Sequence, residues 1–173
     1  LLSNSNKKII ALEGFDLEIV SQEKIWILTM NKKIIIIASN YYHDITENLY
    51  SGVVKYIEWH NNEKKSILEN IDYKIVYTAG SFEIPFLINK FKDKADGFIA
   101  LGCIIRGETY HFEIISNQVS RKIMDLSVDI NKPIGFGVLT CDNLDQAEKR
   151  SDPKRGNKGE EAAIACIKNM YYG

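Results

Sequence analysis

Two long aliphatic runs limit what this chain can fold into. Residues 34–38 read IIIIA and residues 98–105 read FIALGCII, without a charged side chain in either run. Such runs are typical of parallel β-strands buried on both faces of a sheet, whereas a strand with one face in water alternates apolar and polar residues. Both runs are far too short to cross a bilayer. The chain is therefore expected to bury a parallel sheet between layers of helices.

Strand-like and helix-like segments alternate four times along the chain. Two more strands are predicted at 73–77 and 134–139, and apolar residues spaced by three and four predict helices at 45–57, 86–91, 112–130, 144–150 and 158–171. Asp44 is the expected N-cap of the first helix. This order predicts an α/β fold, a flavodoxin-like three-layer α/β/α sandwich with a four-stranded parallel sheet and right-handed crossovers.

Length, charge and cysteine content exclude several classes of protein. The chain has 173 residues, which favours a single domain, and its net charge of −1 offers no broad basic surface to nucleic acid. Cys103, Cys141 and Cys166 are widely spaced and form no CxxC pattern, so no disulfide framework or metal site is expected. We see no signal peptide and no membrane segment, and expect a cytoplasmic protein.

The first thirty residues differ from the rest because they match no motif. They hold two short β-like patches, at 9–12 and 25–28, separated by polar residues. We expect 1–30 to be an N-terminal extension and 31–173 to be the domain. Met30 is a candidate for a natural start, with the stretch before it an addition.

The segment Leu101–Glu113, LGCIIRGETYHFE, is the strongest candidate for a functional site. It predicts a buried strand, a polar turn and the start of a helix, and ligands of open α/β sheets bind at such carboxyl ends of strands. The first turn of a helix also presents free N–H groups that favour anions. Arg106, Thr109 and His111 add a cation, a hydroxyl and a titratable base. A turn that merely connects two elements is the alternative.

Three other strand ends carry comparable groups. Tyr41 follows the first strand and could stack on a planar ligand, or pack over the rim of the core. Glu83 lies in a helix's first turn, where it could complement the dipole or bind ligand hydroxyls. Asp142 or Asn143 is expected to cap the next helix. Residues 150–158 hold four cations, which form either a solvated face or an oxyanion site: Arg150, Lys154, Arg155 and Lys158.

The sequence lacks the motifs of the commonest enzymes of this fold class. There is no glycine-rich loop of the P-loop or dinucleotide type and no GxSxG nucleophile elbow. The third predicted strand also ends without the acidic residue that a phospho-accepting receiver domain needs.

Four motifs in order resemble the lumazine synthase family of riboflavin biosynthesis. They are GSFEIP at 80–85, GCIIRGETYHFE at 102–113, GFGVLT at 135–140, and Arg150 with Lys154 and GNKG at 156–159. The resemblance covers about residues 33–170. Ser81 stands where the family often has Ala, and Asn40-Tyr41 stands where it usually has Arg-Phe. The stacking ring is therefore kept, but the flanking cation is not.

The resemblance implies a reaction without a metal or redox cofactor. The family condenses 5-amino-6-(D-ribitylamino)pyrimidine-2,4-dione with 3,4-dihydroxy-2-butanone 4-phosphate, giving 6,7-dimethyl-8-ribityllumazine, phosphate and water. Such chemistry requires proton shuttling, an anion site and a planar pocket. The resemblance implies that His111 is the catalytic residue for proton transfer. Histidine suits this role because its unperturbed side chain titrates near neutral pH.

The resemblance also implies a set of substrate-binding residues. Arg150 and the turn at 107–109 would bind the phosphate of the second substrate. In the first substrate, Tyr41 would stack on the pyrimidine and backbone groups of 104–105 would bind the ring edge. Phe82 and Glu83 would hold its ribityl chain. The implied substrate-binding set is Tyr41, Ser81, Phe82, Glu83, Ile104, Ile105, Arg106, Gly107, Glu108, Thr109, Phe136, Arg150 and Lys158. Of these, Phe136, Arg150 and Lys158 would reach in from a neighbouring subunit.

Family membership further implies a homo-oligomer, either a pentamer or a shell of twelve pentamers. The helix at 112–130 carries Ile114 and Val128 outside its main apolar stripe, which suits contacts around an axis. The short break at 151–156 favours the shell, whereas Pro153 and the extension at 1–30 favour the isolated pentamer, which we prefer.

Two alternatives belong to other functional classes. The chain could be a non-catalytic subunit of the same fold that binds flavin or lumazine or builds a shell. It could also be a flavodoxin-like electron carrier, which would purify with yellow FMN.

Overall fold

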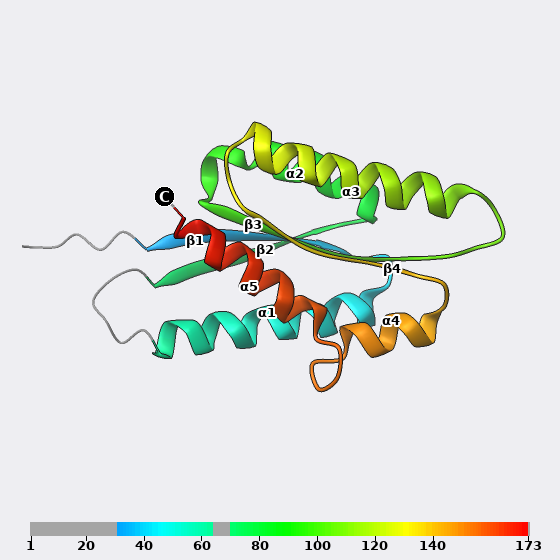
Figure 1. Cartoon of the computed structure of the whole chain (residues 1–173), viewed down its shortest axis with the longest axis horizontal. Coiled ribbons are helices and arrows are strands. Elements are labelled where there is room, and N and C mark those ends of the chain that lie inside the picture. The colour runs from blue at the N-terminus through cyan, green and yellow to red at the C-terminus, as the bar shows by residue number, and fades with distance from the viewer. Residues whose placement is uncertain (1–30, 64–69, 173) are drawn as a thin grey trace, which may run out of the picture. The chain divides into compact units, whose positions relative to one another are not determined.

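The computed structural model of the chain describes residues 31–63 and 70–172 (Figure 1). The expected patches at 9–12 and 25–28 and the proposed start at Met30 lie outside these residues. The strands are β1 (Lys32–Ser39), β2 (Ile71–Thr78), β3 (Gly97–Ile105) and β4 (Ile134–Cys141). The α-helices are α1 (His43–Glu63), α2 (Ile84–Lys90), α3 (His111–Asp129), α4 (Leu144–Ser151) and α5 (Lys158–Met170), and two short 3₁₀ helices are η2 (Ser81–Glu83) and η3 (Lys92–Lys94).

The four strands form one parallel sheet in the order β2-β1-β3-β4. Helices α2 and α3 cover one face, and α1, α4 and α5 cover the other (Figure 1). This is the flavodoxin-like order and confirms the predicted three-layer α/β/α sandwich. In the described part of the chain, no helix combines the length and the apolar character needed to span a membrane.

The aliphatic runs belong to β1 and β3, the two inner strands, and supply both cores. In β1, Ile34 and Ile36 face the core under α1 and α5, whereas Ile35 and Ile37 face the core under α2 and α3. All are buried because each face of the sheet carries a layer of helices. A fully buried aliphatic side chain contributes about 1.5–3 kcal/mol over an exposed one, so these residues hold the three layers together.

One of three predicted helix starts differs in the structure, and two are confirmed. Helix α1 begins at His43, so the prediction of Asp44 as its N-cap is wrong, and Asp44 lies in the first turn beside the positive end of the helix dipole. Helix α2 begins at Ile84 and places Pro85 in its first turn, where a missing N–H costs nothing. Asn143 caps α4 by accepting a hydrogen bond from the Gln146 N–H at 3.0 Å.

The strand order fixes where a ligand can bind. The chain leaves β1 toward β2 on one side, and leaves β3 toward β4 on the other. The loops after β1 and β3 therefore diverge and leave a crevice at the carboxyl ends of these two neighbouring strands. The sequence predicts functional residues after all four strands, and the segments after β1, β2 and β3 surround this crevice.

Helices α1 and α5 pack so closely that a glycine is needed at their contact. A Cβ atom built on Gly159 would lie 1.9 Å from the backbone oxygen of Leu49. By contrast, a Cβ atom built on Gly107 would meet no atom within 4 Å. The contact fixes α5 against α1, and with it the start of α5 at Lys158.

We expect Gly159→Ala to destabilise the protein by about 1–3 kcal/mol or more, because the added methyl group forces two backbones apart. The measurement is the midpoint of thermal unfolding, with Gly107→Ala as the matched control. The control is expected to melt within a few degrees of the wild type. Equal melting of Gly159→Ala and the wild type would contradict the close packing of α1 on α5.

Candidate active site

A cavity of about 630 Å³ opens at the carboxyl ends of β1, β2 and β3. Seven of the predicted site residues line it: Tyr41, Ser81, Phe82, Glu83, Ile104, Ile105 and His111. They come from three segments that are separated by dozens of residues in sequence. The crevice between β1 and β3 brings them together, as the predicted sheet requires.

Two tyrosines form one wall of the cavity. Tyr41 and Tyr42 lie in the turn between β1 and α1, with their ring centroids 5.0 Å apart in an edge-to-face arrangement. The Tyr41 side chain is 74% exposed, so its ring is available to a ligand. Asn40, which replaces the family's usual arginine, pairs its side-chain oxygen with Nδ1 of His43 at 2.8 Å. The Asn40 side chain thus holds the turn through His43.

The segment after β2 forms a second wall as the 3₁₀ helix η2. The Glu83 carboxylate accepts a hydrogen bond from the Gly80 N–H at 3.1 Å, which fixes the entry to the turn. Phe82 is 59% exposed, whereas Ser81 is buried. Within the described residues, the buried Ser81 hydroxyl has no hydrogen-bond partner, so it is free to bind a ligand or a water molecule.

The third segment is the turn from β3 into α3. His111 is the first residue of α3, and its backbone N–H donates to the Thr109 hydroxyl at 3.4 Å. Within the described residues, the N–H groups of Gly107, Glu108 and Thr109 donate to no protein acceptor. Three free N–H groups in front of a long helix can bind an anion.

Arg106, also predicted to bind substrate, is committed to two carboxylates. Its Nε atom lies 2.9 Å from Asp142 Oδ1, and its Nη1 atom bonds to Glu113 Oε1. The guanidinium also lies over the Phe112 ring, 4.3 Å from the centroid. Hydrogen bonding to Arg106 lowers the pKa of both the Asp142 and the Glu113 carboxyls, which therefore stay ionised at neutral pH.

The thiol in the cavity is not a nucleophile at neutral pH. Burial, with a smaller contribution from Cys141, raises the pKa of Cys103 to about 12. The thiolate form that would attack a substrate is therefore almost absent. Among the described residues, no group of three or more His, Cys, Asp or Glu side chains is arranged to hold a metal ion.

Three predicted residues lie away from the cavity. Phe136 is on the edge strand β4, Arg150 is near the end of α4, and Lys158 begins α5, where its amine pairs with Glu161 at 2.6 Å. Arg150 is exposed. None of the three lines the cavity of its own chain. Gly107, Glu108 and Thr109 lie in the turn beside the cavity rather than in its wall.

Some lining residues were not in the predicted set: Tyr42, Gly80, Cys103, Ile114 and Ile115. Ile114 and Ile115 could have been found from helix periodicity, because residues three and four positions after His111 share its face of α3. Cys103 carries no comparable signal, since its sequence neighbours are equally apolar.

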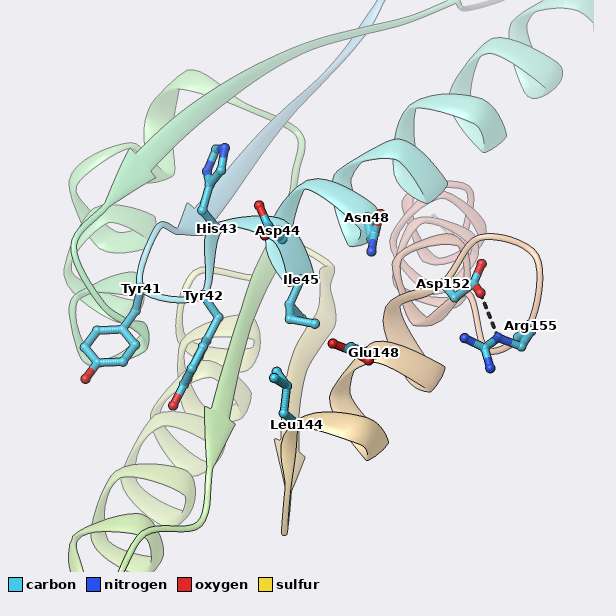
Figure 2. Close-up of a pocket in the computed structure, with 10 residues that line it drawn as sticks. All are labelled: Tyr41, Tyr42, His43, Asp44, Ile45, Asn48, Leu144, Glu148, Asp152 and Arg155. Carbon is cyan, nitrogen blue, oxygen red and sulfur yellow. Dashed lines mark hydrogen bonds and ion pairs between the residues drawn. The ribbon is translucent and has the colours of Figure 1, made fainter.

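A second cavity, of about 580 Å³, lies between the start of α1, α4 and the loop before α5 (Figure 2). Tyr41 and Tyr42 line both cavities and form the boundary between them. Figure 2 shows Arg155 paired with Asp152, at 2.7 Å, within the loop that follows α4. This ion pair holds the loop that connects Arg150 to Lys158.

The fold and the cavity define a flavodoxin-like α/β protein that binds a small ligand at the carboxyl edge of its sheet. Comparison with known families identifies which one. The family model described as 6,7-dimethyl-8-ribityllumazine synthase matches residues 31–172. The chain belongs to this family.

Several curated relatives are similar to the chain over most of its length. All three described here are named 6,7-dimethyl-8-ribityllumazine synthase. The protein from Kosmotoga olearia is 39% identical over 137 residues, which are 78% of this chain and 84% of the relative. The proteins from Leuconostoc mesenteroides and Aquifex aeolicus are each 39% identical, over 79% and 76% of this chain and 85% and 83% of the relatives.

Proposed function

We propose that this chain condenses 5-amino-6-(D-ribitylamino)pyrimidine-2,4-dione with 3,4-dihydroxy-2-butanone 4-phosphate to 6,7-dimethyl-8-ribityllumazine, in riboflavin biosynthesis. The observation that carries the proposal is the meeting of predicted residues from three strand ends at one cavity, beside a turn with free N–H groups. Family membership gives the same reaction class, a transferase. The proposed reaction requires neither a metal nor a redox cofactor.

The cavity has the character that a planar heterocycle with a polyol chain needs. Tyr41 offers an exposed ring for stacking on the pyrimidine, at the opening of the cavity. Ile104 and Ile105 end β3 and offer backbone groups to the ring edge. Phe82 and Glu83 in η2 are assigned to the ribityl chain, with the Ser81 hydroxyl below them.

The turn before α3 suits the phosphate of the second substrate. The free N–H groups of 107–109 precede a helix of 19 residues, whose dipole favours a negative charge at this end. The Thr109 hydroxyl adds a further donor. His111 follows directly and lines the cavity, so it can reach both substrates and transfer protons during imine formation and phosphate loss.

The site is proposed to be completed by a neighbouring subunit. Arg150, Phe136 and Lys158 lie outside the cavity of their own chain, although the resemblance assigns them to it. A ring joins two different faces of each subunit, so these residues can enter the next subunit's cavity. Exposed apolar residues on α3 and β4 offer contact surface: Ile114, Met124, Val128 and Phe136.

The oligomer is proposed to be a homopentamer, with a sixty-subunit shell as the alternative. We further propose that residues 31–173 are the single lumazine synthase domain and 1–30 a separate extension. The cytoplasm is the proposed compartment. The three cysteines are unpaired and buried, which suits a reducing environment.

We expect His111→Ala to lower kcat by roughly 10²–10³, the size of a lost general acid–base group. Lumazine fluorescence after mixing both substrates measures the rate. Lys149→Ala is the control, because Lys149 pairs with Asp145 on α4 and lines neither the cavity nor the turn that carries Tyr41. A His111→Ala rate near that of the wild type would contradict the assignment of His111 as the group that transfers protons. Absence of lumazine from the wild type would favour the non-catalytic alternative.

We expect Arg150→Ala to raise KM for the phosphate substrate about 10- to 150-fold, which corresponds to about 1.5–3 kcal/mol for a lost charge-assisted hydrogen bond. The control is Lys149→Ala, which removes the adjacent cation that pairs with Asp145 at 2.8 Å. An increase confined to KM for the ribitylamino substrate would assign Arg150 to a different pocket.

Mixing the two impaired variants tests whether the site is shared, provided that the phosphate substrate is kept well below its KM so that Arg150→Ala is also slow. When His111→Ala and Arg150→Ala chains are refolded together in equal amounts, about one quarter of the sites in a ring receive both native residues. We expect activity to return toward about a quarter of the wild-type level. If the mixture stays as inactive as its components, both residues act within one chain.

We expect a pentamer mass near five times the 19.8 kDa of the chain, about 99 kDa, by light scattering with size exclusion. A mass near sixty chains would replace the pentamer by the shell. A monomer would contradict the shared site, because Arg150 would then have no cavity to enter.

A further inference from the structure

Arg106 joins three elements around the turn that is proposed to bind phosphate. It directly follows β3, its partner Asp142 directly follows β4, and its partner Glu113 lies in the first turn of α3. The Arg106 N–H also donates to the Cys141 carbonyl at 2.9 Å, and the Asp142 N–H donates to Gln146 Oε1 at 3.0 Å. The side-chain bridge is therefore anchored to the backbone at its β4 end.

The bridge encloses residues 107–110. Arg106 directly precedes this turn and Glu113 follows it by three residues. Their ion pair therefore ties the two ends of the turn together, and we call this pair, with Asp142, the clamp. Two hydrogen bonds tie the C-terminal half of the turn to α3, from the His111 N–H to the Thr109 hydroxyl at 3.4 Å and from the Ile114 N–H to the Tyr110 carbonyl at 3.3 Å. The start of the turn is open, since a Cβ atom on Gly107 would meet nothing within 4 Å. Its free N–H groups can bind an anion well only if they are held in one orientation.

Charge argues against Arg106 itself as the phosphate ligand. One guanidinium faces two carboxylates, and Phe112 lies against its plane. A phosphate that bound Arg106 would have to displace one of the two carboxylates from the guanidinium. The displaced, negatively charged carboxylate would then lie unpaired beside the phosphate. Loss of Arg106 would likewise leave two negative charges beside the phosphate turn.

We propose that Arg106 is a positioning residue, which clamps the 107–110 turn through Glu113 and Asp142 so that the turn's N–H groups face the phosphate. The inference rests on the proposed function, because it takes the turn as the phosphate site. It differs from the assignment of Arg106 as a substrate ligand, since the guanidinium acts through its two carboxylates and contacts no substrate.

Kinetics of four single variants, one double variant and a control separate the two roles. If Arg106 is a clamp, the variants Arg106→Gln, Asp142→Asn and Glu113→Gln each raise KM for the phosphate substrate roughly tenfold, a coupling of ordinary size. The double variant Arg106→Gln with Asp142→Asn then has the same KM as Arg106→Gln alone, because both changes break the same clamp. Arg106→Lys does not restore KM, because an ammonium cannot bridge both carboxylates with a planar fork. Asp145→Asn, an exposed acid that pairs with Lys149, is the matched control and leaves KM unchanged.

A direct phosphate ligand gives the opposite pattern. Asp142→Asn would then release the guanidinium and lower KM, and Arg106→Lys would bind phosphate and largely restore KM. Additive losses in the double variant would also overturn the clamp.

Hydrogen exchange tests the clamp without relying on activity. The protected N–H groups on either side of the turn report on it: that of Arg106 donates to the Cys141 carbonyl and that of Ile114 to the Tyr110 carbonyl. We expect both to exchange at least several-fold faster in Arg106→Gln and Asp142→Asn than in the wild type and in Asp145→Asn. Inorganic phosphate should slow the exchange of the 107–109 N–H groups in the wild type, and less in the two clamp variants. Equal exchange in all four proteins would overturn the clamp, whereas altered exchange in an inactive wild type would overturn only the proposed function.

Discussion

β1 and β3 lie side by side in the middle of the sheet, and their aliphatic side chains are buried on both faces. This pairing holds the two helical layers together, because alternate residues of each strand enter opposite cores. It also sets the position of the cavity. The chain turns away to opposite sides after these two strands, so their carboxyl ends are left uncovered. The interaction that stabilises the core thus also opens the site.

The electrostatics of the site come mainly from the backbone and from paired charges. Free N–H groups at 107–109 and the N-terminus of α3 supply a positive potential without a side-chain cation. Arg106 is neutralised by two carboxylates, and the family's usual arginine beside Tyr41 is replaced by Asn40, which bonds to His43. The cavity of a single chain therefore holds little unpaired positive charge for a phosphate. Arg150 would supply it from a neighbouring subunit.

Close packing on the other face of the sheet positions the residues proposed to serve that neighbour. Gly159 allows α5 to approach the backbone of α1, and Asn157 caps α5 from a left-handed conformation that asparagine tolerates. The Asp152–Arg155 ion pair fixes the loop between α4 and α5. Arg150 and Lys158 lie at the two ends of this loop, so the same contacts fix the positions of both cations on the protein surface.

The sequence by itself determined the sheet, the order of its elements and the strand ends that carry the site. A strand buried on both faces needs a continuous apolar run, and a helix buried on one face needs apolar residues spaced by three and four. Both patterns can therefore be recognised from neighbouring residues alone. The resemblance of four motifs added the family, which the comparisons confirm, and the predicted role of His111. Seven of the predicted residues line one cavity because parallel strands place their carboxyl ends together.

Only the tertiary structure decided which side chains are free to act. The commitment of Arg106 to Asp142 and Glu113, the burial that keeps Cys103 a thiol, and the distance of Arg150 from its own cavity depend on contacts between segments remote in sequence. A local pattern records which groups are present, but the fold decides which partners they meet.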